Sequence, residues 1–197
     1  MEQIQTIRSH LERRLDSLKR LADQERVHHS TLQSLLRDGI EMESPVNDWS
    51  YAERRLIELI SRSIQFRRGQ CFGNAQRAAL LAAQLGAASA THTILYCEGY
   101  AHLPMPAPFS HGWCLLNGRV WDPTLEHLQV PARYLGILIP LSFVHAVASK
   151  RGRFGPILHR WQARLWRGNL PATVERPTGV GSVVGQGGGL AGAGARI

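Results

Sequence analysis

The stretch HGWCLLNGRVWDPT (residues 111–124) carries the clearest turn signal in the chain, Asn117-Gly118 between two apolar runs. An Asn-Gly pair between alternating runs is the strongest short-range signal for a β-hairpin. If the turn has two residues, the alternation of side chains places His111 and Asp122 on one face of the ribbon. The two are then diagonal neighbours with backbones about 7–8 Å apart, a separation that an imidazole and a carboxylate can bridge. The hairpin therefore predicts a histidine–aspartate pair, which a one-residue slip in register would separate.

The segment QCFGNAQRAALLAAQL (residues 70–85) reads as an Ala- and Leu-rich helix that ends at Gly86. Cys71 stands at its start, where free N–H groups and the helix dipole favour a thiolate by roughly 0.3–1 kcal/mol. Gly69 permits a tight turn that leaves the Cys71 N–H free to face a developing oxyanion. The alternative is that Cys71 is a small, inert core residue, as free cysteines usually are.

A reactive thiolate needs an imidazole beside it, and the imidazole needs an acceptor that orients it. Taken alone, His111 reads as a histidine bonded to a backbone carbonyl, and Asp122 as the start of an Asp-Pro-Thr turn. Taken with Cys71, in the order Cys, His, Asp, they favour a functional set. In that set Asp122 holds the imidazole and Trp113 covers it.

The motifs CFGNA, HGW and WDPT, in this order, resemble the transglutaminase-like branch of the papain-like cysteine enzymes. In those enzymes the nucleophile opens a helix, the histidine starts a strand and the aspartate lies on the next strand. The resemblance covers residues 71–124, about a quarter of the chain. It implies that Cys71 is the nucleophile, His111 the general base and acid, and Asp122 the carboxylate that orients the imidazole.

The side chain that would help to hold an oxyanion is left open by the sequence. Papain-like proteases carry a glutamine six residues before the cysteine and a glycine two before it, and Gln65 and Gly69 stand at those offsets. Gln65 also fits the solvated face of a predicted helix, and Gln70 is an equally open candidate. Asn74 either contacts substrate or caps the loop before the helix, and we expect the cap.

The remaining elements are predicted from hydrophobic periodicity. Helices are expected over residues 1–37, 48–66 and 141–149, and strands over 91–101 and 134–137. The first helix is expected to pack against its own domain or a like subunit rather than form a long zipper, which leaves a homodimer open. Together these elements predict an α+β fold, with N-terminal helices, the helix that begins at Cys71 and a C-terminal helix around a small antiparallel sheet.

We expect three regions along the 197 residues. Residues 1–46 form an N-terminal helical segment, residues 47–172 the transglutaminase-like domain, and residues 173–197 a Gly-rich tail. The last 19 residues hold eight glycines and no aromatic side chain, so we expect the tail to be disordered.

Composition narrows the class of protein. The longest apolar candidate, residues 134–148, is shorter than the roughly 20 residues of a spanning helix, and the first residues lack the apolar core of a signal peptide. Three cysteines without a CxxC pair fit reduced thiols better than a disulfide framework. We therefore expect a cytoplasmic protein that does not enter a membrane.

No cofactor or metal is expected. The candidate ligands His92, Cys97, His102, Cys114 and His127 lack the short paired spacing of zinc sites. Glu98 either lines the cleft near Cys71 or forms the polar side of an edge strand.

The net charge of +8 comes from the C-terminal part, because residues 127–197 hold nine Lys and Arg against Glu175 alone. Residues 150–167 combine six basic groups with aromatic side chains, which fits phosphate binding or attraction to an acidic surface. We favour the alternative, an amphipathic helix at residues 157–166 whose arginines face water.

The sequence therefore predicts a thiol hydrolase or acyltransferase that forms a thioester with an amide or acyl substrate, whether a peptide, a protein or a small molecule. Resolution by water makes it a peptidase or amidohydrolase, and resolution by an amine makes it an acyltransferase. Two alternatives are a catalytically silent copy of the fold used for binding, and nucleic-acid binding through the basic C-terminal helix.

Overall fold

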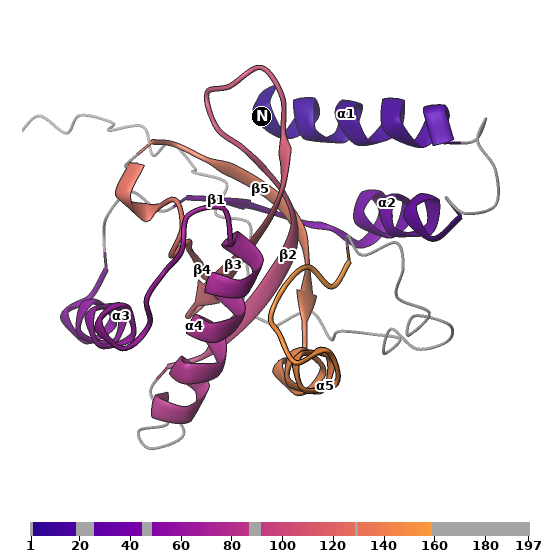
Figure 1. The fold of residues 1–197 in the computed structure, drawn as a ribbon. Coiled ribbons are helices and arrows are strands. Elements are labelled where there is room, and N and C mark those ends of the chain that lie inside the picture. The colour runs from indigo at the N-terminus through magenta and orange to yellow at the C-terminus, as the bar shows by residue number, and fades with distance from the viewer. Residues whose placement is uncertain (1, 19–25, 45–48, 87–91, 129, 159–197) are drawn as a thin grey trace, which may run out of the picture.

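The computed structural model describes residues 2–18, 26–44, 49–86, 92–128 and 130–158, and it has an α+β fold (Figure 1). Five antiparallel strands form one curled, half-barrel sheet in the order β1-β5-β2-β3-β4. The strands are β1 (Ile40–Glu43), β2 (Ile94–His102), β3 (Phe109–Leu116), β4 (Arg119–Trp121) and β5 (Arg133–Ile139). The predicted α+β class is thereby confirmed.

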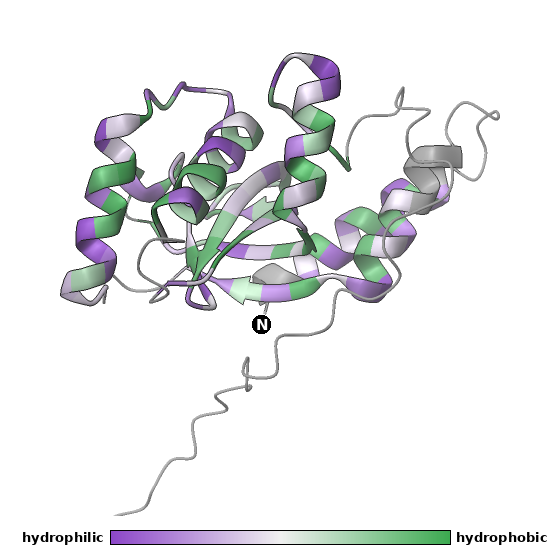
Figure 2. Ribbon diagram, turned by 90° about the horizontal axis from the view of Figure 1, so that it is seen from below, coloured by the Kyte–Doolittle hydropathy of each residue, from purple (hydrophilic) through white to green (hydrophobic). Residues whose placement is uncertain are grey.

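The helices pack on one face of this sheet. They are α1 (Glu2–Leu18), α2 (Arg26–Asp38), α3 (Tyr51–Ser63), α4 (Cys71–Gly86) and α5 (Leu141–Arg151), with a 3-10 turn, η2 (Glu126–Leu128). Helix α4 lies against β3 and β2, and α3 and α5 lie against α4. Hydrophilic and hydrophobic residues interleave along the helices in Figure 2, as expected of amphipathic helices that cover a sheet. None of the described helices is both long enough and apolar enough to cross a membrane.

The opposite face of the sheet encloses a second, smaller core. Trp113, Leu115, Val120 and Tyr134 are buried there, and residues of the loops that follow β2 and β4 pack against them. Because side chains alternate along a strand, His111 and Trp113 both face this second core while Gly112 between them faces α4. The cysteine helix and the histidine side chain therefore start on opposite faces of β3.

The predicted hairpin is confirmed, with its register. Asn117 and Gly118 have φ angles of 51° and 79°, the two positive values that a type I′ turn requires. Leu116 pairs with Arg119 and Cys114 with Trp121, as expected from a two-residue turn.

The prediction of one helix over residues 1–37 is wrong. The chain forms α1 and α2, which lie side by side and bury Ile7 and Leu11 together with Leu32 and Leu35 in the main core (Figure 1). A straight helix of that length would extend about 55 Å, so two shorter helices bury more apolar surface on a small sheet. The apolar stripe packs against the protein's own sheet, and a homodimer through it stays a prediction.

Strand β1 lies inside the segment predicted to be helical, residues 1–46, and pairs with β5. At the other end, α5 confirms the helix predicted at residues 141–149, and β5 confirms the predicted strand. Residues 152–158 are not helical, and the predicted helix at 157–166 lies outside the described residues from 159 onward, as does the whole Gly-rich tail.

Candidate active site

Cys71 is the first residue of α4 and is half-buried. The turn before it closes with a 3.2 Å hydrogen bond from the Gln70 N–H to the Arg67 carbonyl, and it needs Gly69 at a φ of 73°. The first helical hydrogen bond runs from the Asn74 N–H to the Gln70 carbonyl at 2.8 Å. The Cys71 N–H therefore precedes the helical ladder and has no acceptor among the described residues.

Asn74 fixes this turn from inside the helix. Its side chain accepts a hydrogen bond from the Arg67 N–H at 3.0 Å and donates one to the Arg67 carbonyl at 2.8 Å. The same amide nitrogen donates to the Thr124 hydroxyl at 3.2 Å, which ties α4 to the Asp-Pro-Thr turn. The expectation that Asn74 caps the loop is confirmed.

Gly112 brings α4 close to β3, a role that the sequence reading missed. A Cβ at this position would lie 3.0 Å from the Cα of Phe72 and 3.0 Å from the Tyr96 hydroxyl oxygen. The helix start therefore rests directly on the backbone of the strand that carries His111. The glycine in the HGW motif was the available signal.

The predicted histidine–aspartate pair is present and buried. The His111 Nε2–H donates to Asp122 Oδ2 at 2.7 Å, and the two residues are 1% and 6% exposed. Asp122 Oδ1 accepts the backbone N–H groups of Thr124 and Leu125 at 3.0 and 3.1 Å. Asp122 therefore serves both readings that the sequence left open: one oxygen starts the turn and the other holds the imidazole.

Tyr134 completes the surroundings of the pair and was not predicted. Its hydroxyl donates to Asp122 Oδ2 at 3.1 Å, from a strand that is not a neighbour of β4 in the sheet. Burial raises the pKa of Tyr134, so the hydroxyl keeps its proton and acts as a donor. The curl of the sheet brings these two strands together.

Aromatic rings enclose the imidazole. Phe109 meets His111 edge-on at 5.4 Å between ring centroids, and Trp113 lies nearly parallel to it at 6.4 Å. The ring of Tyr134 lies 6.4 Å away and packs against Trp113 at 4.9 Å. These contacts fix the ring in position and exclude water from it.

The pKa of His111 rises to about 9. Burial of the ring lowers it, but the charge and hydrogen bond of Asp122 and the nearby Cys71 raise it further. Asp122 occupies Nε2, and Nδ1 is buried with no hydrogen-bond partner in the part of the chain that the structure describes. Nδ1 is therefore the ring nitrogen that remains open to the Cys71 thiol.

The two glutamines named as oxyanion candidates are not brought to this site. Helix α3 ends at Ser63, so Gln65 lies beyond it rather than inside a helix as predicted, and its side chain is exposed. Gln70 is also exposed and caps α4 through its backbone carbonyl. Neither side chain has a hydrogen bond to Cys71 or His111 among the described residues.

Glu98 matches neither of its two predicted places. It lies on β2, a central strand, and is 0% exposed. Its carboxylate accepts the backbone N–H groups of Ile157 and Leu158 at 2.7–3.0 Å and the Tyr96 hydroxyl at 3.0 Å. Gln76 holds the same segment through both backbone groups of Gly155. These side chains fix the segment after α5 against α4.

The other candidate ligands that the sequence offered lie apart from this site in the described part of the chain. Burial raises the pKa of the Cys97 and Cys114 thiols, and His102 binds the Met105 carbonyl at 2.9 Å. Within the described ranges, no group of three His, Cys, Asp or Glu residues is arranged to hold a metal ion.

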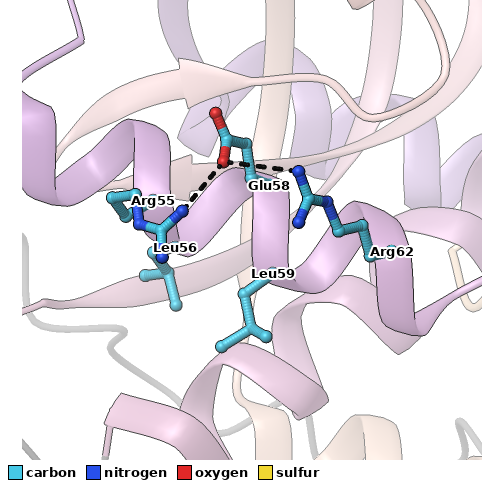
Figure 3. Close-up of a pocket in the computed structure, with 5 residues that line it drawn as sticks. All are labelled: Arg55, Leu56, Glu58, Leu59 and Arg62. Carbon is cyan, nitrogen blue, oxygen red and sulfur yellow. Dashed lines mark hydrogen bonds and ion pairs between the residues drawn. The ribbon is translucent and has the colours of Figure 1, made fainter.

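A shallow hollow of about 240 Å³ lies on α3, away from the residues above (Figure 3). Its lining is Arg55, Leu56, Glu58, Leu59 and Arg62. Glu58 forms ion pairs with both arginines, at 3.4 and 4.0 Å, so the charged groups of this hollow satisfy one another.

No protein-family model, curated protein or solved structure matches this chain.

Proposed function

We propose that the protein is a cysteine-dependent enzyme of the transglutaminase-like, papain-like kind, acting on an amide or acyl bond. One observation carries the proposal: a buried His111–Asp122 pair that leaves the second ring nitrogen open, with Cys71 at the start of the helix that packs on the same strand. A thiol, an imidazole and an orienting carboxylate in this order are the components of an activated nucleophile.

In the proposed resting state the proton of the Cys71 thiol already lies on His111 Nδ1, so that a thiolate stands beside an imidazolium. The thiolate attacks the substrate carbonyl carbon, and the oxyanion that forms faces the Cys71 N–H, which the helix leaves without an acceptor. His111 then gives its proton to the leaving amine or alcohol as the bond to it breaks, and a thioester remains. Water or a second amine attacks the thioester, loses a proton to His111 and restores the thiol.

Asp122 and Tyr134 act as positioning residues in this scheme. Asp122 Oδ1 is held by two backbone N–H groups, so the carboxylate cannot rotate away from the imidazole. Its negative charge stabilises the imidazolium that forms when Cys71 gives up its proton. Tyr134 donates to the oxygen that holds the ring and limits its movement further.

The described residues support the two alternatives, a fold used only for binding and a nucleic-acid-binding protein, less well than an enzyme. A fold used only for binding gives no reason to bury an ionisable pair beside a half-buried thiol, because burial of such groups is costly. The basic segment that would bind nucleic acid lies mostly beyond residue 158, outside the described chain.

The test is the rate of Cys71 alkylation by iodoacetamide between pH 4 and pH 10, read by peptide mass spectrometry. We expect Cys71 to react at least about tenfold faster than Cys97 or Cys114, to react below pH 7, and to slow in His111→Ala. The matched control is His127→Ala, which removes an exposed histidine. A rate that rises only near pH 8.5, as for a free thiol, and is the same in His111→Ala would refute the proposal.

A second measurement separates hydrolysis from acyl transfer. The protein is acylated with p-nitrophenyl acetate and the acetylated Cys71 peptide is followed with and without an added primary amine. Loss of the acetyl group to water alone supports a hydrolase, and formation of the acetylated amine supports an acyltransferase.

A further inference from the structure

Three arginines surround the start of α4. Arg67 and Arg68 are exposed on the turn before Cys71, and Arg77 reaches back along the helix from its second turn. The Arg77 guanidinium donates to the Gly73 carbonyl at 3.2 Å and to Asn74 Oδ1 at 2.9 Å. Its charged end is therefore held beside the first turn of the helix that Cys71 opens.

Asn74 joins two of these residues at a single atom. Its Oδ1 accepts both the Arg67 N–H, at 3.0 Å, and the Arg77 guanidinium. The Arg67 backbone is fixed on both sides by the same amide, so the Arg67 side chain starts from a rigid point. Burial and the nearby charge of Arg67 lower the pKa of Arg77, as expected for like charges held close together.

Arg77 lacks, in the described structure, the carboxylate partner that several other half-buried arginines have. Several half-buried arginines pair with a glutamate, namely Arg8 with Glu41, Arg119 with Glu53 and Arg133 with Glu43. Among the residues that the structure describes, no carboxylate forms an ion pair with Arg67, Arg68 or Arg77. The Arg77 guanidinium and the Arg67 backbone N–H meet at one oxygen in the first turn of α4, and the described chain supplies no carboxylate to balance the Arg77 charge.

We propose that Arg67, Arg68 and Arg77 bind an anionic group of the substrate that Cys71 attacks, so that the enzyme prefers acyl substrates carrying a carboxylate or a phosphate. Arginine suits this role because its planar fork matches the oxygens of both groups and keeps its charge at any physiological pH. An anion bound there relieves the repulsion between the arginines. The inference rests on the proposed function and names the substrate class for that site.

The first test compares two alkylating reagents of nearly equal size, iodoacetate and iodoacetamide, which differ in charge. Both form the same bond, from Cys71 sulfur to carbon, and both release iodide. Changes in the reactivity of the thiol itself affect both rate constants and cancel in their ratio. The ratio therefore reports how strongly the site favours the negatively charged reagent. The ratio is measured for the full chain, for Arg67→Gln/Arg68→Gln and for Arg77→Gln.

We expect the iodoacetate-to-iodoacetamide ratio to fall about threefold per arginine removed. In the unmodified protein the ratio should also fall as added salt screens the arginine charges. Arg77→Lys keeps the charge and is expected to keep most of the ratio, which guards against a folding defect in Arg77→Gln. The matched control is Arg55→Gln/Arg62→Gln, which removes two positive charges from α3. His111 is present throughout, so its own charge does not distinguish the variants.

Competition identifies the anion. Inorganic phosphate and glutarate are each tested for protection of Cys71 against iodoacetamide in the unmodified protein and in Arg67→Gln/Arg68→Gln. Saturable protection by phosphate alone indicates a phosphorylated substrate, and protection by glutarate indicates a carboxylate. Protection that is lost in the variant supports the proposal in either case.

An equal ratio in all variants would overturn the inference, and so would an equal fall in the α3 control, which would mean attraction by net charge. If both reagents label Cys71 slowly, and at the same rate in His111→Ala as in the unmodified protein, the proposed function itself is refuted. The two failures are therefore distinguishable in one set of measurements.

Discussion

The charged state of His111 predicts how the stability of the protein depends on pH. Its pKa rises from 6.5 in an unfolded chain to about 9 in the fold, because the charge and hydrogen bond of Asp122, together with the nearby Cys71, outweigh burial. A raised pKa means that the fold favours the protonated ring. The contribution is therefore complete below about pH 6.5, falls as pH rises, and is lost above about pH 9. At about 1.4 kcal/mol for a tenfold change in equilibrium, it amounts to about 3 kcal/mol.

The assay is urea unfolding, followed by the fluorescence of the buried Trp113 and Trp121, at intervals from pH 5.5 to pH 10. The unmodified protein is compared with His111→Gln, whose amide still donates to Asp122 but does not titrate. Subtracting the two free energies of unfolding removes the titration of the other groups. We expect the difference to decrease by about 3 kcal/mol between pH 6.5 and pH 9.

Asp122→Asn provides an independent variant, because loss of the carboxylate charge should return the His111 pKa toward or below 6.5 and move the transition to lower pH. A difference that is constant from pH 6 to pH 9.5, or that increases with pH, would refute the reasoning. NMR of the ring nitrogens gives a second check. A neutral His111 imidazole at pH 7.5 would also contradict the reasoning.

Three further substitutions test the contacts around the site. Gly112→Ala brings a Cβ to 3.0 Å from the Phe72 backbone, so we expect a loss of about 1–3 kcal/mol in thermal unfolding and slower alkylation of Cys71. Gly155→Ala, where a Cβ meets nothing within 4 Å, is the control that should keep its melting temperature. Asn74→Ala removes the hydrogen bonds that hold the turn before α4, and we expect a loss of about 2–3 kcal/mol and faster proteolysis of that turn. Glu98→Gln turns an amide donor toward two buried N–H groups, and we expect a loss of about 2–3 kcal/mol in urea unfolding, with the pH dependence of alkylation unchanged.

The parts of the site that the sequence predicted depend on local rules. Asn117-Gly118 fixes the hairpin register, and the register places His111 and Asp122 diagonally on one face of the ribbon. Gly69 before an Ala-rich run places Cys71 at a helix start. Each of these inferences uses residues close together in the chain, where turn chemistry and side-chain alternation determine the geometry.

The parts that the sequence did not predict depend on how distant strands meet. Tyr134 reaches Asp122 only because the sheet curls, and no local pattern gives the order of strands in a sheet. Glu98 looked like a surface or cleft residue because its partners are the N–H groups of a segment nearly 60 residues later. Strand β1 was hidden because four residues are too few to show a period.

The use of both Asp122 oxygens has a consequence for the tautomer of the imidazole. A carboxylate only accepts, so Nε2 of His111 carries a proton, and in the proposed reaction the proton exchanged with Cys71 is the one on Nδ1. An asparagine at 122 would point its oxygen at the two backbone N–H groups and its NH₂ at the ring. The neutral imidazole would then place its hydrogen on Nδ1, facing the thiol, and could no longer accept the thiol proton. The backbone of a surface turn thereby determines on which side the histidine is a base.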